Sequence, residues 1–287
     1  MEILRSSKPK VQLRVTEGYK KISKIISGNH LNTVCEEARC PNIYDCWGRE
    51  TATFMILGDV CTRSCRFCSV KTGKPSPIDL SEHERISKAV KEMGLRHVVL
   101  TSVDRDDLKN DFGATIWAKT IVEIKNTSPN CTIEVLTPDF QGFLPALQKV
   151  FNAKPDIFSH NVECIERISK QIRVQANWNR SLNVLKSSVD HGLLTKSGIM
   201  VGLGESKEEV ISTMQQVVDL GVKIFTIGQY LQPTKSHVSV DRYVEKSEFE
   251  LYKVKGLEMG FDIVESGPLV RSSYHADEQA SSVLNAL

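Results

Sequence analysis

Residues 53–68 read TFMILGDVCTRSCRFC, a run of β-prone apolar residues that leads through Gly58 and Asp59 into three cysteines. These cysteines, Cys61, Cys65 and Cys68, follow the spacing C-x3-C-x2-C and form the second triplet of the chain. Three thiolates on one tight loop can hold three corners of a cubane iron–sulfur cluster and leave its fourth iron free for a substrate or cofactor. The stretch therefore predicts a buried strand that delivers a metal-binding loop at its carboxyl end.

Zinc is the alternative metal for this loop. A structural zinc site usually completes its tetrahedron with a further Cys or His close by. The next histidine downstream is His83, which falls inside a predicted helix. The residues thus favour iron–sulfur ligation, although the spacing alone leaves zinc open.

A first triplet of cysteines precedes this stretch. Cys35, Cys40 and Cys46 have the spacing C-x4-C-x5-C and predict a separate site ahead of the first core strand. A zinc knot that pins the N-terminal extension is the alternative interpretation. Clustered cysteines in a long chain indicate metal ligation in a reducing compartment rather than a disulfide scaffold. Cys131 and Cys164 stand alone, and we interpret them as buried small apolar residues.

The composition of the whole chain limits its function. The chain has 287 residues, of which 40% are hydrophobic and 25% charged, and its formal net charge is +2. This balance is typical of a globular protein with a real core and excludes disorder as the dominant state. No apolar run approaches the ~20 residues of a membrane span, and the net charge is far below that of a polyanion-binding protein. We therefore expect neither a membrane nor a nucleic acid as a partner.

After residue 50 the chain alternates short β-rich runs with amphipathic helices, a pattern that predicts parallel βαβ units. The predicted strands are 53–57, 97–101, 132–137, 156–159, 198–201 and 223–231, with 261–265 as a possible seventh. The predicted fold class is α/β: a partial (β/α)6 barrel with N-terminal and C-terminal extensions. A doubly wound open sheet is the alternative, but no Gly-rich fingerprint follows the first strand.

Ser-x-x-Glu capping boxes predict the starts of three helices. They are Ser81 with Glu84, Ser206 with Glu209, and Ser247 with Glu250. Gly94 and Gly221 are predicted to end the first two of these helices.

Polar residues follow each predicted strand. They occupy 58–61, 101–107, 137–139, 159–163, 202–205 and 229–233. Because the carboxyl ends of parallel strands meet at one mouth of a barrel, this pattern predicts a site for a polar small molecule there. The residues leave open whether His160 belongs to that site or is a hydrogen-bonded core histidine.

The second triplet, with Phe67 just before its last cysteine and a core strand before it, resembles the radical S-adenosylmethionine superfamily. The resemblance implies a 4Fe–4S cluster on Cys61, Cys65 and Cys68 whose open iron binds S-adenosylmethionine. It also implies reductive cleavage of that molecule to a radical that abstracts hydrogen from an unactivated carbon. By resemblance, the residues that contact S-adenosylmethionine are Phe67, Ser102, Asp104, Asn161, Glu163, Arg180, Gly202 and Glu205.

Both triplets together with the C-terminal stretch VRSSYH, residues 270–275, resemble the lipoyl synthases. The likeness runs from about residue 33 to the C-terminus. It implies insertion of two sulfur atoms at C6 and C8 of a protein-bound octanoyl-lysine, with two molecules of S-adenosylmethionine consumed. It also implies a second, auxiliary 4Fe–4S cluster on Cys35, Cys40 and Cys46, which donates the sulfur. The fourth ligand of that cluster is a serine oxygen, assigned to Ser273 with Ser272 as the runner-up.

The resemblance further implies partners and a domain plan. The expected partners are an octanoylated lipoyl carrier protein (an E2 subunit or the glycine cleavage H protein), a ferredoxin- or flavodoxin-type electron donor and an iron–sulfur cluster carrier. The expected location is the cytoplasm or an organelle matrix. The expected units are an N-terminal extension over 1–50, a radical barrel over 51–260 and a C-terminal extension over 261–287 that closes over the auxiliary cluster.

Two other classes of protein remain open at this point. One is a different radical enzyme with an auxiliary cluster, similar to biotin synthase or to a tRNA methylthiotransferase. The near-neutral charge speaks against tRNA as a substrate. The other is a zinc-stabilised binding protein without enzymatic activity.

Overall fold

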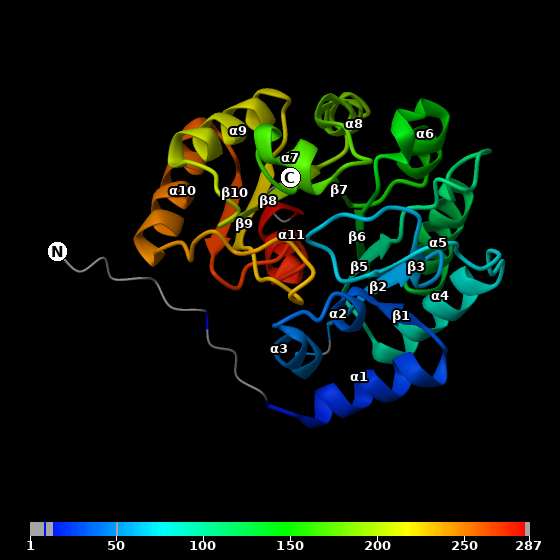
Figure 1. Ribbon diagram of the computed structural model, residues 1–287. Coiled ribbons are helices and arrows are strands. Elements are labelled where there is room, and N and C mark those ends of the chain that lie inside the picture. The colour runs from blue at the N-terminus through cyan, green and yellow to red at the C-terminus, as the bar shows by residue number, and fades with distance from the viewer. Residues whose placement is uncertain (1–8, 10–13, 50, 285–287) are drawn as a thin grey trace.

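The computed structural model describes residues 9, 14–49 and 51–284 (Figure 1). Its main sheet has eight strands in the order β1-β2-β5-β6-β7-β8-β9-β10, and every neighbouring pair from β2 to β10 is parallel. The parallel strands are β2 (Thr53–Ile56), β5 (His97–Ser102), β6 (Thr132–Leu136), β7 (Ile157–Ser159), β8 (Thr195–Val201), β9 (Ile224–Gln229) and β10 (Ile263–Gly267). The predicted partial barrel is confirmed, and the possible seventh strand is present as β10.

Helices connect these strands and cover the outside of the sheet, as Figure 1 shows. They are α4 (Glu82–Met93), α5 (Ala114–Thr127), η1 (Phe140–Gly142), α6 (Leu144–Asn152), α7 (Glu166–Ile172), α8 (Trp178–Asp190), α9 (Lys207–Asp219) and α10 (Lys246–Met259). Successive residues of the strands are buried, because a parallel sheet inside a ring of helices is covered on both faces. Among the described helices, none is both long enough and apolar enough to span a bilayer.

Only one of the three predicted capping boxes forms. The Ser206 hydroxyl accepts a hydrogen bond from the Glu209 amide, and the Glu209 carboxylate accepts one from the Ser206 amide. The Ser81 hydroxyl instead donates to Asp79, although the helix does begin after it. The prediction at Ser247 is wrong, since α10 begins one residue earlier, at Lys246, with Glu245 at its cap.

The helix ends follow the glycines as predicted. Gly94 has φ +68° at the end of α4, and Gly221 has φ +95° just beyond α9. A left-handed φ of this kind is accessible to glycine at little cost, and it lets the chain turn back towards the next strand.

The N-terminal extension packs on the side of the sheet where β2 begins. Its elements are α1 (Glu17–Gly28), β1 (Asn32–Thr33), α2 (Val34–Glu37) and α3 (Ile43–Gly48), and β1 pairs antiparallel with β2. Tyr19 of α1 stacks on Tyr44 of α3 and packs at a tilt against Trp47, with ring centroids 5.2 Å and 5.0 Å apart. The remainder of the predicted extension, residues 1–8, 10–13 and 50, lies outside the described residues.

The C-terminal helix α11 (Ala276–Leu284) is seen near the middle of the molecule in the view of Figure 1. Ala280 packs with Ile157 and Ile224, which are the first residues of β7 and β9. The helix therefore covers the amino-terminal end of the barrel, opposite the end to which β2 delivers the second triplet.

Candidate active site

The loop of the second triplet is fixed to the barrel by backbone hydrogen bonds. Cys61 lies in β3 (Val60–Cys61), which pairs with β4 (Lys71–Thr72). The Thr62 amide donates to the carbonyl of Asp104, 3.0 Å away, and the Asp104 amide points back at the Cys61 sulfur at 3.3 Å. These contacts tie the loop to the carboxyl end of β5.

A second segment holds the far side of the same loop. The Val238 amide donates to the Arg66 carbonyl at 3.0 Å, and the His237 ring nitrogen Nε2 lies 2.9 Å from the Cys68 carbonyl. The Arg66 amide donates to Ile172 at 2.8 Å. The loop is thereby held from β5, from α7 and from the segment after β9.

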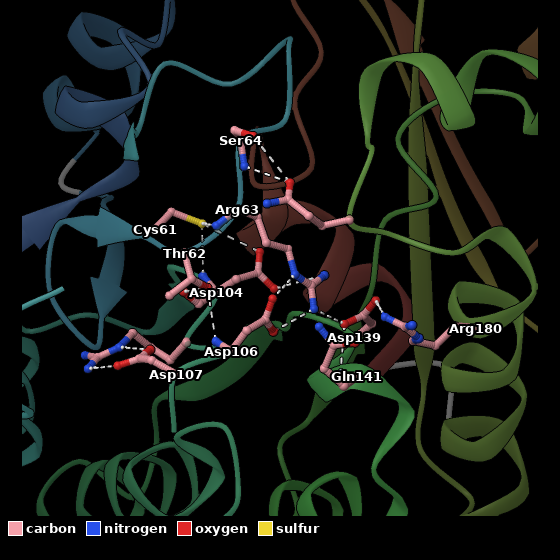
Figure 2. Close-up of polar contacts among 12 residues, drawn as sticks. Cys61, Thr62, Arg63, Ser64, Asp104, Asp106, Asp107, Asp139, Gln141 and Arg180 are labelled. Atoms are coloured by element: carbon pink, nitrogen blue, oxygen red, sulfur yellow. Dashed lines mark hydrogen bonds and ion pairs between the residues drawn. The ribbon is translucent and has the colours of Figure 1, made fainter. Parts of the chain in front are cut away.

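A buried arginine within the triplet organises the carboxylates at the barrel mouth (Figure 2). The Arg63 guanidinium makes a bidentate pair with Asp106 at 2.7 and 2.9 Å, and it also reaches Asp139 at 2.6 Å and Asp104 at 3.2 Å. Arg180 from α8 pairs with the other oxygen of Asp139 at 3.1 Å. A third buried arginine, Arg173, attracts the carboxylates of Asp104 and Glu163. Three arginines thus face four carboxyl groups, so the site has one negative charge more than it has positive charges when all four are ionised.

Burial and charge act in opposite directions on these carboxyl groups. Burial raises the pKa of Asp104 to about 6, against the opposing pull of Arg63. Burial also disfavours the charge of Asp139, but hydrogen bonds and attraction from Arg63 outweigh it and hold the pKa near 2. The excess negative charge is therefore least well satisfied at Asp104, whose carboxyl oxygen lies 3.8 Å from the Cys61 sulfur.

One cavity, here named the second cavity, lies inside the barrel near the carboxyl ends of β7, β8 and β9. It is lined by Asn161, Glu163, Gly198, Ile199, Met200, Thr226, Gly228, Val270, Arg271 and Ser272. Asn161 Nδ2 donates to the Ser272 hydroxyl at 2.6 Å, whereas Asn161 Oδ1 is buried without a partner among the described residues. Burial raises the pKa of Glu163. A ligand with hydrogen-bond donors and positive charge would satisfy both groups.

The other residues predicted to contact S-adenosylmethionine divide into two groups. The Ser102 hydroxyl, at the end of β5, is buried without a hydrogen-bond partner among the described residues, and Phe67 is half-buried against the core. Glu205, by contrast, uses its two carboxylate oxygens to accept from the backbone amides of Gly202 at 2.6 Å and Leu203 at 2.9 Å. Glu205 therefore shapes its turn, and Arg180 is engaged with Asp139.

The first triplet surrounds a cavity of its own, and the C-terminal segment (residues 268–275) helps to line it. The lining residues are Val34, Cys35, Cys40, Asn42, Cys46, Thr51, Ala52, Thr53, His97, Val99, Arg271, Ser273, Tyr274, Ala276 and Asp277. Thr53 and His97 are the first residues of β2 and β5, so this cavity lies towards the amino-terminal end of the barrel. Ser273 faces it, while Ser272 faces the second cavity.

The described cysteines are all free thiols, and burial raises the pKa values of those in both triplets. The pKa is about 12 for Cys35 and Cys65 and about 11 for Cys61. A buried thiol with a raised pKa becomes a thiolate when a bound metal supplies positive charge, so both triplets fit iron. Within the described ranges, no three Cys, His, Asp or Glu side chains converge on one ion. A cubane does not require such convergence, because each thiolate binds a different iron.

Sequence reasoning missed the central role of Arg63. It is one of two arginines inside the cysteine motif, and the available signal was an arginine there together with the aspartates that follow the second predicted strand. It also missed Asn42, whose side chain contacts a residue 227 positions away. His160 is a core histidine: Nδ1 lies 2.9 Å from the Thr137 carbonyl and Nε2 lies 3.0 Å from the Ser181 hydroxyl. Cys131 and Cys164 are buried, as interpreted.

A parallel partial barrel with a C-x3-C-x2-C loop at the end of its first parallel strand defines a radical S-adenosylmethionine enzyme. The family model of the Radical SAM superfamily matches residues 55–217, more than half of the chain. Within that superfamily, the chain belongs to the lipoyl synthase family. Membership in this family of sulfur-inserting enzymes implies 4Fe–4S clusters and S-adenosylmethionine, and it does not favour the biotin synthase-like or zinc alternatives.

The family assignment rests on similarity over nearly the whole chain. Lipoyl synthase of Rubrobacter xylanophilus is 56% identical over 264 residues, which are 91% of this chain and 82% of that protein. The mitochondrial lipoyl synthase of Nematostella vectensis is 48% identical and covers 96% of this chain and 95% of its own length. The crystal structure of methylornithine synthase aligns with a TM-score of 0.57 at 13% identity over 92% of this chain and 82% of that one. This last likeness is one of fold.

Proposed function

We propose that this chain inserts sulfur at C6 and C8 of an octanoyl-lysine and that its two cysteine triplets have separate roles. Alkyl C–H bonds are not acidic, so general-base chemistry cannot open them and a cofactor-derived radical is needed. Bound 4Fe–4S clusters would supply the electron that cleaves S-adenosylmethionine at one triplet and the sulfur atoms at the other. The protein contributes binding, orientation and the exclusion of water.

The second triplet is the proposed site of radical formation. Cys61, Cys65 and Cys68 would hold its cluster, and the polar groups of the second cavity would bind S-adenosylmethionine. Three features support this: the excess negative charge near Asp104, the unpartnered oxygen of Asn161 and the buried carboxyl of Glu163. A cationic cosubstrate would balance the first and hydrogen-bond the others.

The first triplet is the proposed sulfur source. The observation that carries this proposal is the single cavity lined by Cys35, Cys40, Cys46 and Ser273. A hard serine oxygen binds cluster iron less firmly than a thiolate does, which suits an iron that must be lost when sulfur leaves. The octanoyl chain would extend through the barrel between the two cavities, since Arg271 borders both.

The substrate of the family is an octanoylated carrier protein, and an E2 subunit or the glycine cleavage H protein is the proposed form of it. A ferredoxin- or flavodoxin-type protein would deliver electrons, and an iron–sulfur carrier would rebuild the auxiliary cluster. The described cysteines are all free, which supports a reducing compartment, the cytoplasm or an organelle matrix.

Turnover of an octanoyl-lysine peptide tests the proposed function directly. The reconstituted chain is given the peptide, a reductant and S-adenosylmethionine, and the products are analysed by mass spectrometry. We expect a peptide that has gained two sulfur atoms. Two 5′-deoxyadenosine molecules should form for each such peptide, one for each sulfur atom. A peptide recovered without sulfur, from protein that carries both clusters, would contradict the proposal.

A further inference from the structure

We propose that Asn42 and Asn161 are positioning residues that set the register of the C-terminal segment, so that Ser273 rather than Ser272 enters the cavity of the first triplet. The inference rests on the proposed role of that cavity as the auxiliary cluster site. Two adjacent serines are chemically identical, so something other than their chemistry must determine which one faces the cysteines.

The two serines occupy one tight turn. The Tyr274 amide donates to the Arg271 carbonyl at 2.9 Å, which makes Ser272 and Ser273 the central residues of a β-turn. The two residues line different cavities, and Arg271 borders both. A shift of the segment by one residue would place Ser272 where Ser273 now lies and Arg271 where Ser272 now lies.

Asn42 holds the segment from the side of the first triplet. Its Nδ2 donates to the Leu269 carbonyl at 2.7 Å, and its side chain is buried. The Asn42 carbonyl accepts from the Cys46 amide at 2.9 Å, which ties the same residue to the triplet itself. Through Asn42, the loop that carries the cysteines fixes the position of the turn that contains the two serines.

Asn161 holds the segment from the opposite side. Its Nδ2 donates to the Ser272 hydroxyl at 2.6 Å, which keeps that serine turned away from the cysteines. In the register that would turn Ser272 towards the cysteines, Arg271 would replace Ser272 beside Asn161, and the Asn161 amide would lose its hydroxyl acceptor. An amide donor at each end defines this register, because a buried carbonyl or hydroxyl left without its partner is costly.

The barrel wall leaves little room for another register. A Cβ added at Gly228 of β9 would lie 2.1 Å from the Val270 carbonyl oxygen, so the segment runs directly against the strand. Beyond the turn, Arg49 of the N-terminal extension pairs with Glu278 at 2.6 Å and Asp277 at 3.2 Å. The segment is thus anchored before, within and after the two serines.

Hydrogen exchange of the full-length chain, with and without its clusters and in the absence of S-adenosylmethionine, tests this inference. Asn42→Leu keeps the size of the side chain but removes its donor. We expect amide exchange across 269–275 to rise about tenfold, the effect of losing one buried hydrogen bond. Asn29→Ala is the matched control, because it deletes a similar bond to Ile25, of 2.9 Å, at the end of α1. The control should leave exchange at 269–275 unchanged.

A spectroscopic measurement separates positioning from general support. In protein whose second triplet is replaced by alanine, Mössbauer spectra report on the auxiliary cluster alone. Asn42→Leu should abolish the signal of the oxygen-ligated iron, while Asn29→Ala should keep it. If Asn42→Leu does not fold, Asn161→Leu takes its place with the same expected results.

Unchanged exchange at 269–275 in both asparagine variants would overturn the inference, as would an iron signal that persists after the segment has loosened. The proposed function fails in a different way. If Ser273→Ala keeps the oxygen-ligated iron signal, the serine ligand is wrong, yet the exchange results would still establish the role of the two asparagines.

Discussion

Arg63 is the shared counter-ion of the carboxylates at the mouth of the barrel. Its side chain is buried, and it is the shared partner of Asp104, Asp106 and Asp139. Arg63→Met should lower the free energy of unfolding by about 3–5 kcal/mol, because it removes the counter-ion of Asp104 and Asp106 and leaves Asp139 with Arg180 alone. Urea denaturation of the metal-free chain measures this change.

Arg167 offers the control for Arg63. It also makes a bidentate pair, with Glu209 at 2.8 and 2.9 Å, but it is exposed to solvent. Arg167→Met should destabilise the chain far less than Arg63→Met does, since water screens exposed pairs. Equal losses in the two variants would show that burial of the Arg63 network does not matter.

The two neighbouring serines allow a residue-scale test of the sulfur source. Ser273→Ala should preserve the fold and the cleavage of S-adenosylmethionine but severely impair sulfur insertion, because one iron of the auxiliary cluster loses its protein ligand. Ser273→Cys should keep a full cluster and also insert sulfur poorly, since a thiolate holds that iron more firmly. Product yield and 5′-deoxyadenosine are measured together. Wild-type yield from both variants, with Ser272→Ala inactive, would transfer the role to Ser272.

His160 predicts a pH dependence of stability. Burial lowers its pKa to about 4, whereas an unfolded histidine titrates near 6.5. As the pH falls from about 6.5 towards 4, the unfolded chain therefore binds a proton that the folded chain does not, and stability is lost. Above pH 6.5 His160 is neutral in both the folded and the unfolded chain, so it does not affect the pH dependence of stability.

His160→Gln should remove up to about 1.4 kcal/mol per pH unit from the slope of stability between pH 6 and pH 4.5. Urea denaturation at several pH values measures both proteins. His97, whose pKa burial also lowers to about 4, and Asp104, whose raised pKa acts in the opposite direction, remain in both proteins. Their contributions cancel in the difference, and parallel curves for the two proteins would contradict the assignment.

At the scale of single residues, the sequence predicted the chemistry better than the contacts. The cysteine spacings identify both triplets, because ligand spacing on a loop is a local property. The role of Glu205 was missed, since nothing local shows that its carboxylate accepts from the Gly202 and Leu203 amides. Arg63 was missed for the same reason, because its three partners come from two different strand ends.

At the scale of elements, the capping boxes give a paired prediction. Ser206→Ala should lower the free energy of unfolding by about 1 kcal/mol, because the hydroxyl satisfies the Glu209 amide at the start of α9. Ser247→Ala should change it by only a few tenths of a kcal/mol, since Ser247 lies inside α10 and does not cap it. Chemical denaturation compares the two variants. Similar losses would show that the hydrogen bond from the Glu209 amide to Ser206 does not contribute to the free energy of unfolding.

The strands and helices were predictable because each follows a local rule, whereas their exact starts were not. Alternation of apolar runs and amphipathic stripes fixes the βα order, and all six predicted strands form within a few residues of their expected bounds. The motif Ser-x-x-Glu is shared by Ser81, Ser206 and Ser247, but only at Ser206 do the side chain and the backbone meet to form the box. That outcome depends on how the preceding loop enters the helix.

At the scale of the whole molecule, the decisive contacts join the two ends of the chain. Asn42 meets Leu269 across 227 residues, and Arg49 meets Glu278 across 229. Neither periodicity nor motif spacing contains such pairings, so only the resemblance to a family connected the C-terminal serine with the first triplet. In the structure, the chain after the end of β10 runs against β9 and reaches the cavity at the start of β2, so Ser273 lines the same cavity as the first triplet.

The two triplets lie towards opposite ends of the barrel, so each should be removable without the other. Thr53, the first residue of β2, borders the first cavity, while the second triplet follows the carboxyl end of that strand. Reconstituted wild-type chain should carry about eight irons, and each triple alanine variant about four. Replacing Cys61, Cys65 and Cys68 should abolish 5′-deoxyadenosine formation while the auxiliary cluster stays. Replacing Cys35, Cys40 and Cys46 should preserve 5′-deoxyadenosine formation but yield no sulfur-containing product. Retained 5′-deoxyadenosine in the former variant, or lipoyl product at the wild-type rate in the latter, would show that the roles are not divided between the two ends.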